Sequence, residues 1–397
     1  MKKILIPISM LFLIVLAGCA GKHSTPVSLE DNPSNHYLQG MALIEKDDWN
    51  SAERRFERAL ALEPTFAPAM AGKALILAHG AAGFSAQEHK YIETKAFRSM
   101  LSEGYSKAED DTQRFIVVTT AIRAETEARS KNWCAKATQW YSKHNRLHNV
   151  ATSKLIYYRS LTALDYFMSK AYFAAGDYLH AKEMLTHVIA ENTSRWHHPA
   201  GKLFAKVHKI ERAIAHYTVT DLSRAIATKD EVSRADVAAL LVNELKLDYL
   251  FTKRLSANVL PEPEYIPADI MEHPLKEEML KVFSWHIRGL EPKYNKATNA
   301  PLFHPATAIT RQELAFTLED ILIKITQDDS LATKFIGQRN SPFPDVQPTQ
   351  ASYNAIMTSV TRNLLENDLT GVFRPADKLD GAELLLAIVR LRNAIAN

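Results

Sequence analysis

A stretch of eleven residues occurs twice in the second half of the chain, at 303–313 and 373–383. Both copies begin with Phe-x-Pro-Ala. An aliphatic residue and then a polar residue follow, and a Glu stands three positions after the polar residue. A polar side chain with a Glu three residues behind it is the signature of a helix capping box. Because apolar residues then recur at helical spacing, each copy predicts a loop that turns into a partly buried helix. The four capping positions are Thr310, Glu313, Asp380 and Glu383.

The repeat extends upstream of these stretches. Residues 266–270 (Ile-Pro-Ala-Asp-Ile) parallel residues 343–346 (Phe-Pro-Asp-Val). Between each Asp and the following Phe the apolar spacing predicts a helix, near 275–288 and near 350–365.

A weaker third copy precedes the other two. Ser233 and Asp236 repeat the pattern of cap and acid, with apolar residues at helical spacing behind them. Ile226 and Thr228 stand where the other copies have Phe and Pro. The sequence therefore predicts three tandem units over residues 216–397.

These units resemble the S-layer homology domain, whose signature is an early Asp, a helix, Phe-x-Pro and then Thr-Arg-Ala-Glu. The chain has Ser-Arg-Ala-Asp at 233–236, Thr-Arg-Gln-Glu at 310–313 and Asp-Gly-Ala-Glu at 380–383. The resemblance implies a compact helical domain of three copies. It also implies that cell-wall polysaccharide or modified peptidoglycan binds in the grooves between copies.

By this resemblance, Arg234 and Arg311 contact an anionic wall ligand, together with the hydroxyl groups of Ser233 and Thr310. A planar guanidinium suits that task because it pairs with two oxygens at once. Gly381 replaces the arginine in the last copy, so we expect the third groove to be weak or inactive. The alternative interpretation is that these motifs only cap helices, with solvated arginines.

The first half of the chain also predicts helices, because glycine is scarce (13 residues) and apolar residues recur every three or four positions. The first two helices resemble a tetratricopeptide repeat, with an aromatic residue among small ones where two helices cross. The positions that match are Gly40, Ala52, Phe56, Ala59 and Pro64. His36, Gln39 and Leu43 depart from the Trp, Leu and Tyr of that pattern.

A second, degenerate copy of this repeat spans residues 162–195. Since such repeats need neighbours to bury their faces, we expect a helical solenoid over residues 36–215 that presents a surface to a protein client. A plain helical bundle is the alternative. The predicted fold is therefore all-α, a solenoid of helical hairpins followed by a compact helical domain.

The amino terminus resembles a bacterial lipoprotein signal. Two lysines precede a short apolar run that ends in Leu-Ala-Gly-Cys at 16–19. The resemblance implies cleavage after residue 18, lipid on Cys19 and a flexible tether over 19–35. Ala20 differs from the Asp of an inner-membrane retention signal, which indicates the outer membrane, at its periplasmic face or at the surface. An ordinary signal peptide with an incidental cysteine is the alternative.

Composition limits the remaining function classes. Without Lys2 and Lys3 the chain has 46 Lys and Arg against 45 Asp and Glu, so no basic excess indicates nucleic acid. With Cys19 lipidated, Cys134 has no disulfide partner, and a buried thiol is the simplest interpretation. His144 and His148 are spaced as ligands on a helix, but no zinc motif surrounds them.

No phosphate-binding loop or nucleophile elbow is present either, so we predict no cofactor, no metal and no catalytic residue. The sequence predicts a non-enzymatic envelope lipoprotein that connects a membrane with the cell wall. Its partners are the membrane through the lipid, wall glycan and an unknown protein client. The alternative is a scaffold for secretion or outer-membrane assembly that does not bind glycan. An enzyme that acts on the wall is a third, unsupported class.

Overall fold

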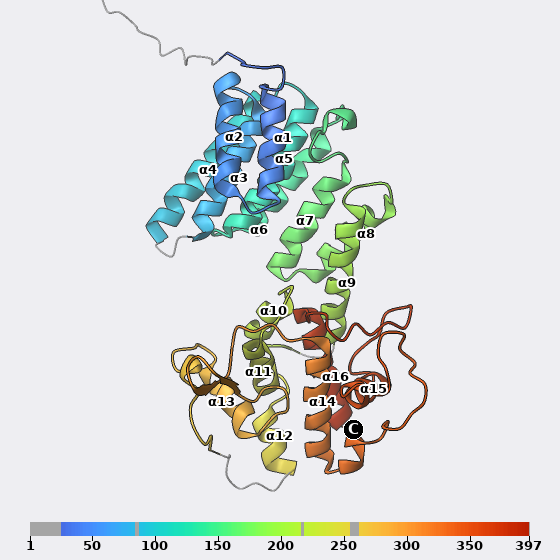
Figure 1. The fold of residues 1–397 in the computed structure, drawn as a ribbon. Helices are drawn as coiled ribbons and strands as arrows, with labels where there is room; N and C mark the ends of the chain where they lie inside the picture. The colour runs from blue at the N-terminus through green and yellow to red at the C-terminus, as the bar shows by residue number, and fades with distance from the viewer. Residues whose placement is uncertain (1–24, 84–86, 216–217, 255–261, 397) are drawn as a thin grey trace, which may run out of the picture. The chain divides into compact units, whose positions relative to one another are not determined.

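The computed structural model describes residues 25–83, 87–215, 218–254 and 262–396, and nearly all of its regular secondary structure is helical (Figure 1). This confirms the predicted all-α fold. The chain divides into two compact units, Met1–Ala171 and Tyr172–Asn397. Within the described residues, no helix is long and apolar enough to cross a membrane. The predicted signal peptide and Cys19 lie outside the described residues.

The first unit is built from helices that pack against their neighbours in the chain (Figure 1). These are α1 (Pro33–Ile44), α2 (Trp49–Leu62), α3 (Ala67–Gly83), α4 (Gln87–Lys107), α5 (Asp111–Ala128) and α6 (Trp133–Ser142), with turns η1 (Lys143–Arg146) and η2 (Thr152–Lys154) and the start of α7 (Thr162–Ala175).

Phe56 on α2 is the centre of the first helix pair. Its ring is fully buried and lies so close to two glycines that a Cβ atom at Gly40 or Gly72 would overlap it. Ala52 and Ala59 are also fully buried. Small residues thus let α1 and α3 approach the aromatic ring, while membership of the tetratricopeptide family stays a prediction.

The chain before α1 is fixed to this unit rather than free. Asp31 accepts hydrogen bonds from Arg58, from the backbone N–H of Val27 and from His36. Chiefly because of the bonds from Arg58, the pKa of Asp31 lies well below its usual range. The predicted flexible tether over 19–35 therefore extends too far, since its described end packs against the domain.

The second unit contains the predicted repeats and the helices that precede them. Its elements are α8 (Tyr178–Ala190), α9 (His197–Ile214), α10 (Asp221–Ala227), α11 (Arg234–Asn243), α12 (Leu247–Arg254), η3 (Ala268–Ile270), α13 (Lys276–Ser284), α14 (Arg311–Thr326), η4 (Asp329–Ala332), α15 (Tyr353–Thr361) and α16 (Gly381–Ala396), with the antiparallel strands β1 (Lys293–Asn295) and β2 (Ala300–Leu302). Helix α9 packs against α16. This contact assigns residues 172–215 to the second unit, whereas the sequence predicts a boundary at 215/216.

Three aliphatic residues join the repeats into a closed ring. Val232 donates its N–H to the carbonyl of Leu379 (3.0 Å), Ile309 donates to Val232 (3.0 Å), and Leu379 donates to Ile309 (3.1 Å). Each of these residues lies just before the cap of a long helix, α11, α14 or α16. The cycle places the three helix starts side by side and connects the last copy to the first.

Candidate functional site

The helix caps of the repeats fix where their functional side chains point. The capping boxes of Ser233 with Asp236 and of Thr310 with Glu313 are both present. Both hydroxyls are therefore engaged with the acid of their own box. In the last copy, Asp380 accepts the N–H of Glu383 at 2.7 Å, but the carboxylate of Glu383 turns to Arg311 instead.

Arg234 is 3% exposed, and each nitrogen of its guanidinium donates to a backbone carbonyl. Nε bonds to Phe303 (2.8 Å), Nη1 to Gly289 (2.5 Å) and Nη2 to Glu291 (2.8 Å). All three acceptors precede the cap of the next copy. The side chain thus connects one repeat to the loop of the following one.

Arg311 does the same one repeat later. Its Nε bonds to the carbonyl of Phe373 (2.7 Å), its Nη2 to that of Glu366 (2.6 Å), and its Nη1 to the carboxylate of Glu383. Its guanidinium also lies over the ring of Phe373, at 4.6 Å. Burial lowers the pKa of Arg311 to about 10, so the side chain is still charged at neutral pH.

An aspartate fixes each of the loops that these arginines hold. Asp345 accepts the N–H groups of Phe373 (2.9 Å) and Arg374 (2.6 Å), and Asp269 does the same for Phe303 and His304. The residue after each Phe has a left-handed φ, 56° at His304 and 60° at Arg374. The repeat pattern contains both aspartates, but it does not indicate their role.

The four residues predicted to bind glycan, Ser233, Arg234, Thr310 and Arg311, are therefore committed to contacts within the chain. A ligand at Arg234 would have to replace existing bonds to carbonyls. Contact of these residues with a wall ligand stays a prediction.

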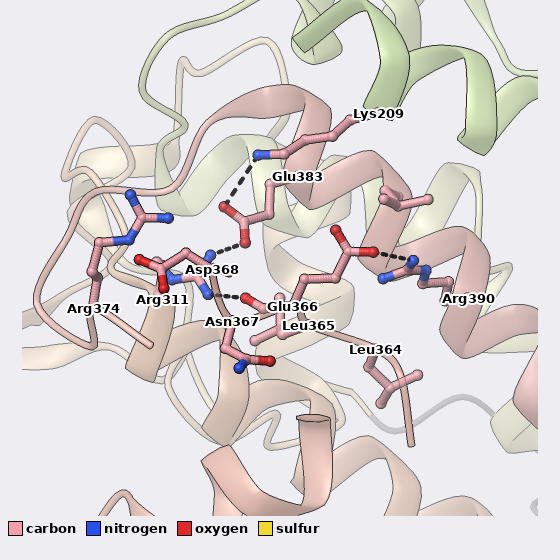
Figure 2. Close-up of a pocket in the computed structure, with 11 residues that line it drawn as sticks. Lys209, Arg311, Leu364, Leu365, Glu366, Asn367, Asp368, Arg374, Glu383 and Arg390 are labelled. Carbon is pink, nitrogen blue, oxygen red and sulfur yellow. Dashed lines mark hydrogen bonds and ion pairs between the residues drawn. The ribbon is translucent and has the colours of Figure 1, made fainter. Parts of the chain in front are cut away.

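A small cavity lies at the junction of the second and third copies (Figure 2). It has a volume of about 110 Å³. The second copy contributes Arg311, the helix α9 contributes Lys209, and the third copy contributes most of the wall. The lining residues from the third copy are Leu364, Leu365, Glu366, Asn367, Asp368, Arg374, Glu383, Leu386 and Arg390.

Most charges around this cavity are paired with one another. Figure 2 shows a chain of contacts that leads from Lys209 through Glu383 to Arg311. The carboxylate of Glu366 accepts bonds from Arg212 (2.8 Å) and Arg390 (2.6 Å). Burial alone would raise the pKa of Glu366, but the bonds from these two arginines outweigh it and bring the pKa to about 2.

We expect Glu366→Gln to lower the thermal stability of the protein at pH 7 and to lower it much less at pH 2.5. A carboxylate with a depressed pKa stabilises the fold above its unfolded pKa, near 4.5, and this stability is lost as the pH falls toward 2. Since 40% of the side chain is exposed, solvent screening limits the effect to about 1 kcal/mol. Thermal unfolding at both pH values measures it. Glu272 is exposed and has no ion-pair partner within the described residues, so Glu272→Gln should change the melting temperature at neither pH. An equal effect of Glu366→Gln at both pH values would contradict the assignment.

Arg374 is the least committed cation of the cavity. Its side chain is 51% exposed, and the nearest carboxylate, that of Asp377, is 3.8 Å away. Arg374 is the variable residue of the Phe-x-Pro motif and was not among the predicted site residues. One feature of the sequence could have indicated it: Arg374 lies within the Phe-x-Pro-Ala loop, which the resemblance places at a groove between copies.

The third copy meets the first at a different kind of junction. There, Gly381 stands at the position that Arg234 and Arg311 occupy in the other two copies. Its N–H donates to Lys229 at 3.0 Å, and a Cβ atom at this position would overlap the carbonyl of Ile226. Ile226 holds the place that Phe303 and Phe373 have in the other copies. The backbones therefore meet directly at this junction, where the others have a guanidinium between them.

In the part of the chain that the structure describes, no three His, Cys, Asp or Glu side chains gather closely enough to hold a metal ion. His144 and His148, whose spacing resembles that of ligands on a helix, are not part of any such group.

Comparison with known families matches residues 342–385 to the S-layer homology domain. The matched segment contains Asp345, the loop with Arg374, and the start of α16. No curated protein and no solved structure matches the chain. The S-layer homology domain is a cell-wall-binding module and not a catalytic one. The third repeat is thus similar to an S-layer homology domain, and this likeness associates the chain with the cell envelope.

Proposed function

We propose that this protein is a non-enzymatic tether between a membrane and the cell wall. Lipid on Cys19 holds the amino terminus to a membrane, for which Ala20 favours the outer one. The helices of the first half bind a protein client, and the repeats of the second half bind wall glycan. Two attachments in series stabilise the link, because binding at one end raises the effective concentration of the other.

The observation that carries the glycan-binding proposal is the exposed guanidinium of Arg374 beside the cavity in the matched repeat. Pockets that enclose a whole small molecule have volumes of about 300–1,000 Å³. This cavity is smaller, about 110 Å³. It suits an acidic substituent of a sugar, such as a carboxylate or phosphate, with the ring held outside. Arg374 can pair with two oxygens of such a group.

We therefore expect Arg374→Gln to weaken binding of the full chain to purified sacculi about tenfold, the loss that removal of one charge-assisted contact produces. Co-sedimentation with sacculi, before and after wall polymers are stripped, measures the binding and identifies the polymer. Arg362→Gln is the matched control, because Arg362 is exposed in the same repeat and does not line the cavity.

Equal binding by both variants would remove Arg374 from the site. No binding of the unaltered protein to either preparation would overturn the tether itself. The function to test next would then be a protein-binding scaffold for secretion or outer-membrane assembly.

A further inference from the structure

A second and much larger cavity lies in the first unit. Its volume is about 1,190 Å³, and it lies between one face of α4 and the turn that connects α5 to α6. Ten residues line it: Tyr91, Thr94, Lys95, Arg98, Ser99, Ser102, Ser130, Lys131, Asn132 and Lys136. Four of these are cations and none is an acid.

Three of the four cations are available to a ligand. Arg98 is committed, since it donates to the buried carboxylate of Glu125 at 2.7 and 2.6 Å. Lys95, Lys131 and Lys136 are exposed, and within the described residues none of them forms an ion pair. The lining therefore carries three positive charges that the neighbouring described side chains do not neutralise.

The lining also contains two uncharged side chains, Thr94 and Tyr91, that a small inorganic anion bound to the lysines would not need. Thr94 is 8% exposed, and its hydroxyl has no hydrogen-bond partner in the described part of the chain. A buried hydroxyl without a partner is unfavourable. Because this oxygen is not accessible in the structure, a ligand would bond to it once the side chain turns toward the cavity, and that bond would relieve the penalty. The ring of Tyr91 is exposed one turn before Thr94, at the amino-terminal end of the lining residues of α4.

We propose that this cavity binds a short, extended, acidic peptide segment of a partner protein. The inference rests on the proposed function, because it gives a chemistry to the protein client. The stripe from Tyr91 to Ser102 rises about 16 Å along α4, which an extended chain covers in about five residues. Carboxylates pair with the three lysines, the peptide backbone reaches the hydroxyls and an apolar side chain lies on Tyr91. The headgroup of an anionic lipid would pair with the lysines without needing Thr94 or Tyr91. An acidic wall glycan, whose sugar rings can also stack on a tyrosine, is separated from a peptide by the test below.

The test is fluorescence anisotropy of the full chain, purified in detergent, with the labelled pentapeptide Asp-Glu-Leu-Glu-Asp. We expect binding that weakens with salt, and none of the amide analogue Asn-Gln-Leu-Gln-Asn. Lys95→Glu combined with Lys131→Glu should weaken binding at least about tenfold, since two attractions become repulsions. Lys46→Glu combined with Lys107→Glu is the matched control, with the same charge change at exposed sites outside the cavity.

A second variant tests the contact without a change of charge. Thr94→Val should weaken binding about threefold without lowering the melting temperature, because the hydroxyl has no partner in the described fold. No peptide binding, equal binding of the amide analogue, or equal losses in both lysine pairs would overturn the proposal. Binding of anionic vesicles or of wall polymer at these lysines, with no peptide binding, would overturn it as well.

Sacculus binding measured on the same preparation separates this proposal from the tether. Loss of peptide binding with intact sacculus binding removes only the peptide site. The reverse result removes only the glycan site.

Discussion

Replacing Gly381 by alanine is expected to destabilise the second unit by about 4 kcal/mol or more. The added Cβ would overlap the carbonyl oxygen of Ile226, which is backbone and cannot turn aside. To make room, the first and third copies must separate, which strains the hydrogen bond from Gly381 to Lys229 and the contact between Leu379 and Val232. A single substitution rarely destabilises a protein this much, and a steric clash in a packed interior is one of the few causes. Urea unfolding followed by circular dichroism measures the loss.

Gly201→Ala is the matched control. Gly201 lies inside α9, and a Cβ atom there meets nothing within 4 Å. Alanine should therefore raise the stability slightly, by up to about 1 kcal/mol, since glycine is the poorer helix former. Gly381→Arg would restore the arginine of the family signature, but we expect it to unfold the domain and not to restore a groove. A stable Gly381→Arg protein would contradict this description of the junction.

Arg311→Ala is expected to destabilise the same unit by about 3–5 kcal/mol. The change removes the guanidinium that pairs with the carboxylate of Glu383 and leaves it only the more distant Lys209 among the described ion pairs. It also deprives the carbonyls of Phe373 and Glu366 of their donor. Breaking a buried pair from one side is much more costly than removing both partners. Arg311→Lys keeps the charge but cannot reach three oxygens at once, so an intermediate loss is expected.

Arg374→Gln serves as the comparison in the same unfolding measurement. The side chain of Arg374 is half-exposed, and its contact with Asp377 is long, at 3.8 Å. The free energy of unfolding of the variant should therefore remain within about 0.5 kcal/mol of that of the unaltered protein. A stable Arg311→Ala protein that no longer binds sacculi would contradict the structural role and support direct ligand contact. An unfolded protein that fails to bind would say nothing about the ligand, so stability must be measured first.

The helix starts of the repeats could be predicted because capping is a local property. Ser233 and Thr310 hydrogen-bond to residues three positions away, which the sequence displays directly. The role of the arginines could not be predicted in the same way. The acceptors of Arg311 lie 55, 62 and 72 residues further along the chain, and only the closed ring brings them together.

The domain boundary shows the same limit. Residues 172–215 have the composition of the helices before them, so a sequence pattern assigns them to the first half. Their assignment to the second unit depends on the packing of α9 against α16, a contact between segments far apart in the chain. Arg374 was missed because a variable position in a motif carries no pattern of its own.

The packing of α9 against α16 also determines how the proposed tether would carry mechanical tension. A pull from the membrane side enters the second unit through the helices that precede the repeats. Lys209 on α9 contacts Asp380 and Glu383 at the start of α16, and Glu383 contacts Arg311 beside the candidate glycan cavity. In the proposed tether, these ion pairs would carry part of the load from α9 straight to the start of α16, in parallel with the backbone that passes through the first copy.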